Sequence, residues 1–145
     1  MFEFYPIEIL DTIKENDKDC LIITIDSSIV GKRGIIDHIE KAIQSPYVKD
    51  NWDGFDEALG DIWWLTDPHI RILHYELPLL SSKDLSIYIH CLYNAFPFWE
   101  MQGYYDIKVF FVENLKERVE NSLVDYTVMM RKRATFSLPK DKTQK

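Results

Sequence analysis

The chain has 145 residues and a net charge of −7, from 24 acidic and 17 basic side chains. Hydrophobic residues make up 46% of it and aromatic residues 14%, enough to bury the core of a single domain over residues 1–145. The acidic balance argues against a nucleic-acid binder, whose affinity depends on cationic contacts to phosphate. No apolar run approaches the roughly 18 residues of a membrane span, and no signal peptide is recognisable. We therefore expect a cytoplasmic protein that binds neither nucleic acid nor membranes.

Charge is unevenly distributed along the chain. From Lys116 to the end there are 8 basic and 4 acidic residues, whereas the preceding residues hold 9 basic and 20 acidic ones. The first part therefore carries a charge of −11 and the second part a charge of +4. An acidic body of this kind fits a cationic partner, and it equally fits a protein that only has to stay soluble.

Three short apolar segments have the composition of β-strands. Residues 20–26 (CLIITID) are β-branched and almost continuously apolar, which is typical of a strand covered on both faces. Residues 69–77 (HIRILHYEL) alternate apolar and polar side chains, and residues 107–112 (IKVFFV) form the third candidate.

Helical patterns lie between the first two strands. Isoleucines recur at helical spacing in residues 35–43, after two glycines that interrupt the chain. Asn51 is a suitable N-cap for a helix over residues 51–65, because its side chain can accept from the free N–H groups of the first turn. Pro68 marks the end of this second helix.

A third helix is expected over residues 83–96, between the second and third strands. Ser81 or Ser82 is its predicted N-cap. Pro97 and Gly103 are predicted to stop it, since proline disrupts a helix interior and glycine often ends one.

The order strand, helix, helix, strand, helix, strand predicts an α/β fold. Strands that alternate with helices usually lie parallel in one sheet, so we expect a small three-stranded parallel sheet with packed helices over about residues 20–113. Cys20 and Cys91 lie among apolar neighbours and are predicted to be small buried core residues, not a disulfide.

Extensions flank this predicted core on both sides. The N-terminal extension, residues 1–19, is expected to hold a helix around residues 7–13. The C-terminal extension, residues 114–138, begins with a helical pattern, but from Asp125 it is compatible with either strand or helix. Residues 139–145 form a polar tail.

The helix over residues 51–65 (NWDGFDEALGDIWWL) has two contrasting faces at 100° per residue. One face is apolar and predicted to join the core: Trp52, Phe55, Ala58, Leu59, Ile62, Trp63 and Leu65. The other is acidic: Asp53, Asp56, Glu57, Gly60, Asp61 and Trp64.

The acidic face is unfavourable for an isolated helix. Glu57 is four residues from both Asp53 and Asp61, and each such like-charge pair costs about 0.2–0.5 kcal/mol. Gly60 costs about 1 kcal/mol relative to alanine, and Trp64 would expose a large ring. This face is either a solvated acidic surface or an interface for a cationic partner, where function outweighs stability.

Other candidate chemistry is sparse. The four histidines, His38, His69, His74 and His90, have no partner at a metal-ligand spacing, and no phosphate-binding loop is present. Asp53, Glu57 and Asp61 would hold Mg²⁺ from one side only, as in a weak surface site. We therefore predict no catalytic residues, no metal, no cofactor and no enzymatic activity.

The run YVKDNWDGFDEALGDIWWL, residues 47–65, resembles the barstar family of intracellular ribonuclease inhibitors. That family has a loop with an aromatic residue, then Asn, an apolar residue and Asp, and a helix with a second acid four residues later. The predicted order of strands and helices also matches, so the resemblance covers about residues 20–113.

The resemblance implies a function and a binding site. Barstar-like proteins insert an acidic helix and its preceding loop into the cationic active site of a ribonuclease, where carboxylates replace RNA phosphates. Asp53 then corresponds to the first interface acid, Glu57 to the central acid, Tyr47 to the loop aromatic and Asn51 to the loop Asn.

This chain departs from the family pattern at several positions. The central acid is Glu57 where the founding member has Asp, and Asp56 replaces a Trp. In the loop, Val48 replaces a Tyr and Lys49 a Gly; Glu100 is the nearest candidate for an additional acid in the third helix. These changes predict a partner with a differently shaped cationic pocket.

The sequence thus predicts an immunity protein, of the kind found in toxin–antitoxin or contact-dependent inhibition systems, that occludes the active site of a ribonuclease toxin. The partner is a cognate cationic toxin, secreted or delivered. The alternative is a module of the same fold for a non-ribonuclease toxin or an endogenous regulatory partner. The predicted contact residues are Tyr47, Asn51, Asp53, Asp56, Glu57, Gly60, Asp61 and Trp64.

Overall fold

The structure, a computed structural model, describes residues 1–46, 50–65 and 69–137, and of residues 133–137 only the helical backbone. Its elements are, in chain order, β1 (Phe2–Tyr5), α1 (Ile7–Asn16), β2 (Leu21–Ile25), α2 (Gly31–Ala42), α3 (Trp52–Gly60), β3 (His69–His74), α4 (Ser82–Gln102), β4 (Asp106–Val112), the 3₁₀ turn η1 (Glu113–Leu115) and α5 (Lys116–Ser137). Within the described residues, none of the helices has both the length and the apolar character that crossing a bilayer requires.

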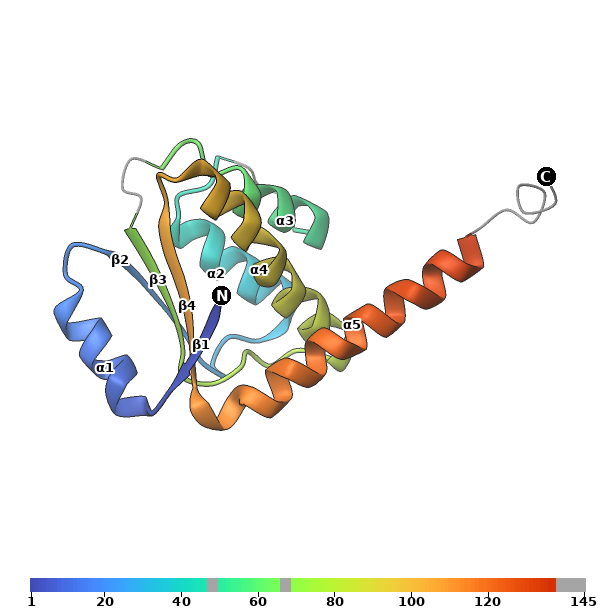
Figure 1. The fold of residues 1–145 in the computed structure, drawn as a ribbon, viewed down its shortest axis with the longest axis horizontal. Helices are drawn as coiled ribbons and strands as arrows, with labels where there is room; N and C mark the ends of the chain where they lie inside the picture. The colour runs from blue at the N-terminus through green and yellow to red at the C-terminus, as the bar shows by residue number, and fades with distance from the viewer. Residues whose placement is uncertain (47–49, 66–68, 138–145) are drawn as a thin grey trace.

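The strands form one parallel sheet in the order β1-β4-β3-β2 (Figure 1). The α/β class and the three predicted strands are confirmed, although β3 already ends at His74. The prediction of a three-stranded sheet is wrong, because the first residues of the chain add β1 beside β4. Phe2 and Phe4 anchor this edge by packing on Phe111, with ring centroids 5.1 and 5.5 Å away.

Helices cover the two faces of the sheet unequally. Figure 1 shows α2, α3 and α4 on one face and α1 alone on the other, while α5 packs on α4. α1 confirms the helix expected around residues 7–13, and the ambiguous stretch after Asp125 is helical as part of α5. The predicted polar tail, residues 139–145, lies outside the described residues.

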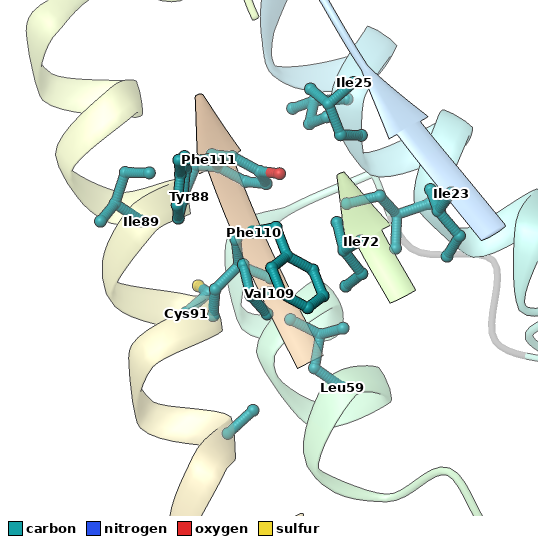
Figure 2. Close-up of a cluster of buried hydrophobic side chains, with 14 of the residues drawn as sticks. Ile23, Ile25, Leu59, Ile72, Tyr88, Ile89, Cys91, Val109, Phe110 and Phe111 are labelled. Atoms are coloured by element: carbon teal, nitrogen blue, oxygen red, sulfur yellow. The ribbon is translucent and has the colours of Figure 1, made fainter. Parts of the chain in front are cut away.

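Apolar side chains from the sheet, α3 and α4 meet in one buried cluster (Figure 2). β3 lies between two strands and is covered on both faces, so all its residues after His69 are buried. The alternation of apolar and polar residue types in this strand is therefore not an alternation of buried and exposed side chains. Cys91 is buried in the cluster as predicted, whereas Cys20 is only half-buried; neither forms a disulfide.

His74 is the fully buried polar residue of this core. Its Nδ1 lies 3.1 Å from the carbonyl oxygen of Phe110, and its Nε2 lies 2.6 Å from the hydroxyl of Tyr88. Because a carbonyl only accepts, Nδ1 carries the proton and the neutral ring accepts from Tyr88 at Nε2. Burial lowers the pKa of His74 to about 3, so the ring is neutral at physiological pH.

Arg71 is the charged residue of the core and joins three segments at the start of β3. It is only 8% exposed, and its guanidinium contacts the carboxylates of Asp106 at 2.8 Å and Asp17 at 3.2 Å. It also donates to the carbonyl oxygens of Ile70 and Asp106. The hydrogen bond from Arg71 lowers the pKa of Asp106, which stabilises the charged pair.

α4 is longer than predicted. Ser81 is the confirmed N-cap, accepting from the backbone N–H of Asp84, but the helix continues through Pro97 to Gln102. Gly103, with φ of 66°, ends it in the left-handed conformation, as predicted. The expectation that Pro97 stops the helix is wrong because tertiary packing holds the last turns: Trp99 is buried and donates from its indole nitrogen to the carbonyl oxygen of Leu59, at 2.8 Å.

Candidate functional site

α3 positions the acidic residues through its capped start and its buried face. The Asn51 side chain accepts from the backbone N–H of Gly54 at 2.7 Å, which confirms it as the N-cap. Phe55 is fully buried against Tyr88 of α4, with ring centroids 6.2 Å apart, and Ala58 and Leu59 are buried with it. The opposite face, with the carboxylates, is thereby held towards solvent.

The helix ends at Gly60, five residues before the predicted end; beyond that point the face assignment holds for Ile62, which is buried in the core, but fails for Trp63 and Trp64. The backbone N–H of Asp61 makes the last helical bond, after which the chain turns away and 100° periodicity no longer applies. Trp63, predicted to join the core, is 64% exposed. Trp64, predicted on the acidic face, is half-buried and donates from its indole nitrogen to the carbonyl oxygen of Ile43, at 2.8 Å.

The acidic face borders a groove of about 610 Å³ between α3 and α4. We call it the α3–α4 groove, and its lining consists of Asp56, Glu57, Gly60, Asp61, Asn94, Ala95 and Phe98. The three acids are exposed, Ala95 is buried, and Phe98 presents an apolar ring that is 53% exposed. The groove therefore combines three carboxylates with an apolar surface, an arrangement suited to a cationic side chain with an alkyl stem.

The surroundings of Asp56 in the groove raise the pKa of its carboxyl group. Although the residue is exposed, neighbouring atoms desolvate its carboxyl group and so raise the pKa; the negative charges of Asp53 and Glu57 raise it further, while His90 opposes them. Burial in turn lowers the pKa of His90, whose ring stacks on Tyr126 with centroids 3.7 Å apart. The negative charge on Asp56 is thus disfavoured in this conformation, and a cation placed in the groove would relieve that cost.

Other predicted contact residues lie elsewhere. Asn51 and Asp53 line a second hollow, of about 680 Å³, together with Lys32 and Lys83. Trp64 lies in a third hollow, bordered by Ala42 and Cys20 among others, so the prediction that it shares a face with the acids is wrong.

Two further expectations concern residues outside the groove. Tyr47, the predicted loop aromatic, falls outside the described residues, as do Val48 and Lys49. Glu100 is exposed on the last turn of α4 and does not line the groove.

The α4 side of the groove was not predicted from the sequence. Asn94, Ala95 and Phe98 were missed because Pro97 suggested that α4 ends before residue 98. The sequence signal that could have found them is spacing: Phe98 lies four residues after Asn94 and three after Ala95, so all three share one face of a helix that continues through Pro97.

The carboxylates considered for Mg²⁺ are not gathered at one place in the structure. Within residues 1–46, 50–65 and 69–137, no group of three or more His, Cys, Asp or Glu side chains is arranged to hold a metal ion. The acids considered for Mg²⁺, Asp53, Glu57 and Asp61, are divided between two hollows, with Asp53 in the second one.

Comparisons of the chain with models of known protein families, with curated proteins and with solved structures find no match. The α/β class and the parallel sheet therefore rest on the structure alone. The barstar resemblance rests on residues 47–65 and on the order of elements, and its functional implication is a proposal.

Proposed function

We propose that this chain is a cytoplasmic, barstar-like immunity protein that binds and occludes the cationic active site of a ribonuclease toxin. The observation that carries the proposal is the α3–α4 groove, in which Asp56, Glu57 and Asp61 face one hollow beside the exposed ring of Phe98. Carboxylates crowded at this density lower the stability of α3, and a cationic ligand would recover that cost.

In this mechanism an arginine or lysine of the toxin enters the groove. Its charged end pairs with the carboxylates of Glu57 and Asp61, and its stem or guanidinium plane packs on Phe98. The toxin residue is then unable to hold an RNA phosphate, so inhibition is steric and electrostatic and requires no chemistry from the inhibitor. The charge of −7 speeds the encounter with a basic toxin, an effect that salt screens.

The second candidate is the same fold acting as a binding module for a non-ribonuclease toxin or an endogenous regulatory partner. The observation that favours it is the separation of Asp53 from the groove: the first interface acid implied by the resemblance lies in another hollow. A partner shaped for the groove and Phe98 would differ from a ribonuclease that requires Asp53 and Glu57 together.

The test is RNA cleavage by a purified ribonuclease toxin encoded beside this gene, with and without the chain. We expect inhibition by the native chain and loss of inhibition with Glu57→Gln and Asp61→Asn combined, because the shape is retained and the charge is removed. Glu15→Gln is the matched control, since this exposed acid lies on α1 across the sheet (Figure 1). If the toxin binds the chain without losing activity, or is not a ribonuclease, the second candidate replaces the first.

A further inference from the structure

The side of α4 that lines the α3–α4 groove continues past the groove as an exposed apolar surface. Phe98 lines the groove, and Met101 lies three residues later, so it follows Phe98 along the same side of the helix. Phe98 is 53% exposed and Met101 is 80% exposed. Two large apolar side chains therefore lie in a row towards the C-terminal end of α4, beginning in the groove itself.

The segment after α4 adds an aromatic ring to this surface. Here the chain contacts the segment that follows α3, where the hydroxyl of Tyr105 donates to the carbonyl oxygen of Ile62 at 3.1 Å. Tyr104 packs edge-on against Tyr105, with ring centroids 5.1 Å apart, and is itself 56% exposed. We define the apolar rim as the three exposed residues Phe98, Met101 and Tyr104.

The apolar rim and the acids of the groove belong to one continuous surface. Ile62, which accepts from Tyr105, directly follows Asp61 of the groove. On the α4 side the connection is direct, because Phe98 belongs both to the groove and to the rim. Phenylalanine, methionine and tyrosine are enriched in protein interfaces, and apolar patches bordered by polar groups mark interaction sites.

The charges beside the rim decide which partner fits. Asp56, Glu57 and Asp61 line the groove, and Glu100 is exposed on the last turn of α4. RNA, an anionic membrane or a second copy of the same surface would each bring negative charge against these carboxylates. A protein segment with a basic side chain is complementary to them, and an apolar side chain close to the basic one would cover the rim.

We propose that the groove and the apolar rim together bind an extended protein segment in which an arginine is followed, two residues later, by a large apolar residue. Residues i and i+2 of an extended chain share one face and lie roughly 6.6 Å apart. Met101 lies about 4.5 Å beyond Phe98 along the axis of α4, so the apolar residue reaches the rim while the arginine occupies the groove.

The guanidinium group suits the groove because it pairs with carboxylates and also stacks on an aromatic ring such as Phe98. The inference rests on the cation-binding role that the proposed function gives to the groove. It adds the apolar half of the contact and a sequence pattern for the partner.

The experiment is an NMR titration of the isotope-labelled native chain with three acetylated tripeptide amides: Arg-Gly-Trp, Arg-Gly-Ala and Gln-Gly-Trp. We expect Arg-Gly-Trp to shift the amide signals of both the groove and the rim. It should bind about tenfold more tightly than Arg-Gly-Ala, because only its indole ring covers the rim. Gln-Gly-Trp should bind at least about tenfold more weakly than Arg-Gly-Trp, because it lacks the cation.

Variants of the chain test the rim directly. Met101→Ala and Tyr104→Ala combined should remove most of the difference between Arg-Gly-Trp and Arg-Gly-Ala, since both residues are exposed and belong to the rim. Ile7→Ala is the matched control, because it removes an exposed apolar side chain from α1, across the sheet from α4 (Figure 1), and should leave the difference unchanged.

Three results would overturn the proposal. One is a failure of Arg-Gly-Trp to bind at millimolar concentration. Another is equal affinity for Arg-Gly-Trp and Arg-Gly-Ala, which would confine recognition to the groove. The third is equal affinity for Arg-Gly-Trp and Gln-Gly-Trp, which would separate the rim from the acids. Because the titration contains no toxin, a chain that binds the peptide without inhibiting the ribonuclease loses only the immunity role.

Discussion

Acidification should destabilise this protein mainly through His74. The neutral ring is fully buried, and its pKa of about 3 in the folded state compares with 6.5 for an unperturbed histidine. Between these values the unfolded chain binds a proton that the folded chain does not, so stability falls as the pH falls below 6.5. At about 1.4 kcal/mol per pKa unit, the loss is about 2 kcal/mol at pH 5. That is a large share of a typical total of about 5–15 kcal/mol.

The assay is urea unfolding of the native chain and of His74→Gln at pH 7.5 and pH 5. Glutamine does not titrate, so the difference between the two chains isolates His74 from carboxylates that also respond to pH. Asp106, whose pKa is lowered, adds stability that is lost only at still lower pH. The raised pKa values of Asp56 and Glu40 have the opposite effect, because they make the folded state more stable as the pH falls. Equal losses in both chains, or an NMR titration of the His74 ring above pH 5, would refute the reasoning.

Further predictions concern the groove and the edge of the sheet. Gly60→Ala should fold at least as stably as the native chain, because the added Cβ would lie 3.8 Å from Phe98, an ordinary contact. The same Cβ narrows the α3–α4 groove, so this variant should bind the toxin severalfold more weakly. Equal affinity of the variant and the native chain by calorimetry would contradict this. Glu57→Gln should reduce both the association rate and its salt dependence in stopped-flow mixing, and an unchanged salt slope would place the steering charge elsewhere. Arg71→Met should cost about 2 kcal/mol in urea unfolding, since it removes the guanidinium that Asp17 and Asp106 share, and a loss under half of that would show that water replaces the guanidinium.

The sequence predicted the elements whose pattern is local and strong. The apolar run of β2, the N-cap Asn51 and the isoleucines of α2 each report their structure within a few residues, and all three are found as expected. β1 was missed because four residues are too few to show a period, and their partner β4 lies about a hundred residues later. The end of α3 was misplaced because an apolar–acidic pattern continues past Gly60 after the helix has stopped.

The α3 side of the candidate site was predictable because its pattern is also local. Asp56, Glu57, Gly60 and Asp61 lie within two turns or directly after them, so helical periodicity alone places them together. Phe98 and its neighbours on α4 depend on a helix that passes through a proline, which local rules disfavour and tertiary packing permits. Trp64 depends on where the chain turns after α3, and no local pattern encodes that turn.

The strand order has a consequence for synthesis of the chain. β1 pairs only with β4 in the sheet, so during synthesis this strand has no sheet neighbour until residues 106–112 have been made. At about 5–20 residues per second, this interval lasts on the order of 5–20 s, during which Phe2 and Phe4 lack the ring of Phe111 on which both pack. β1 is therefore among the last strands to pair, although it is made before the other three.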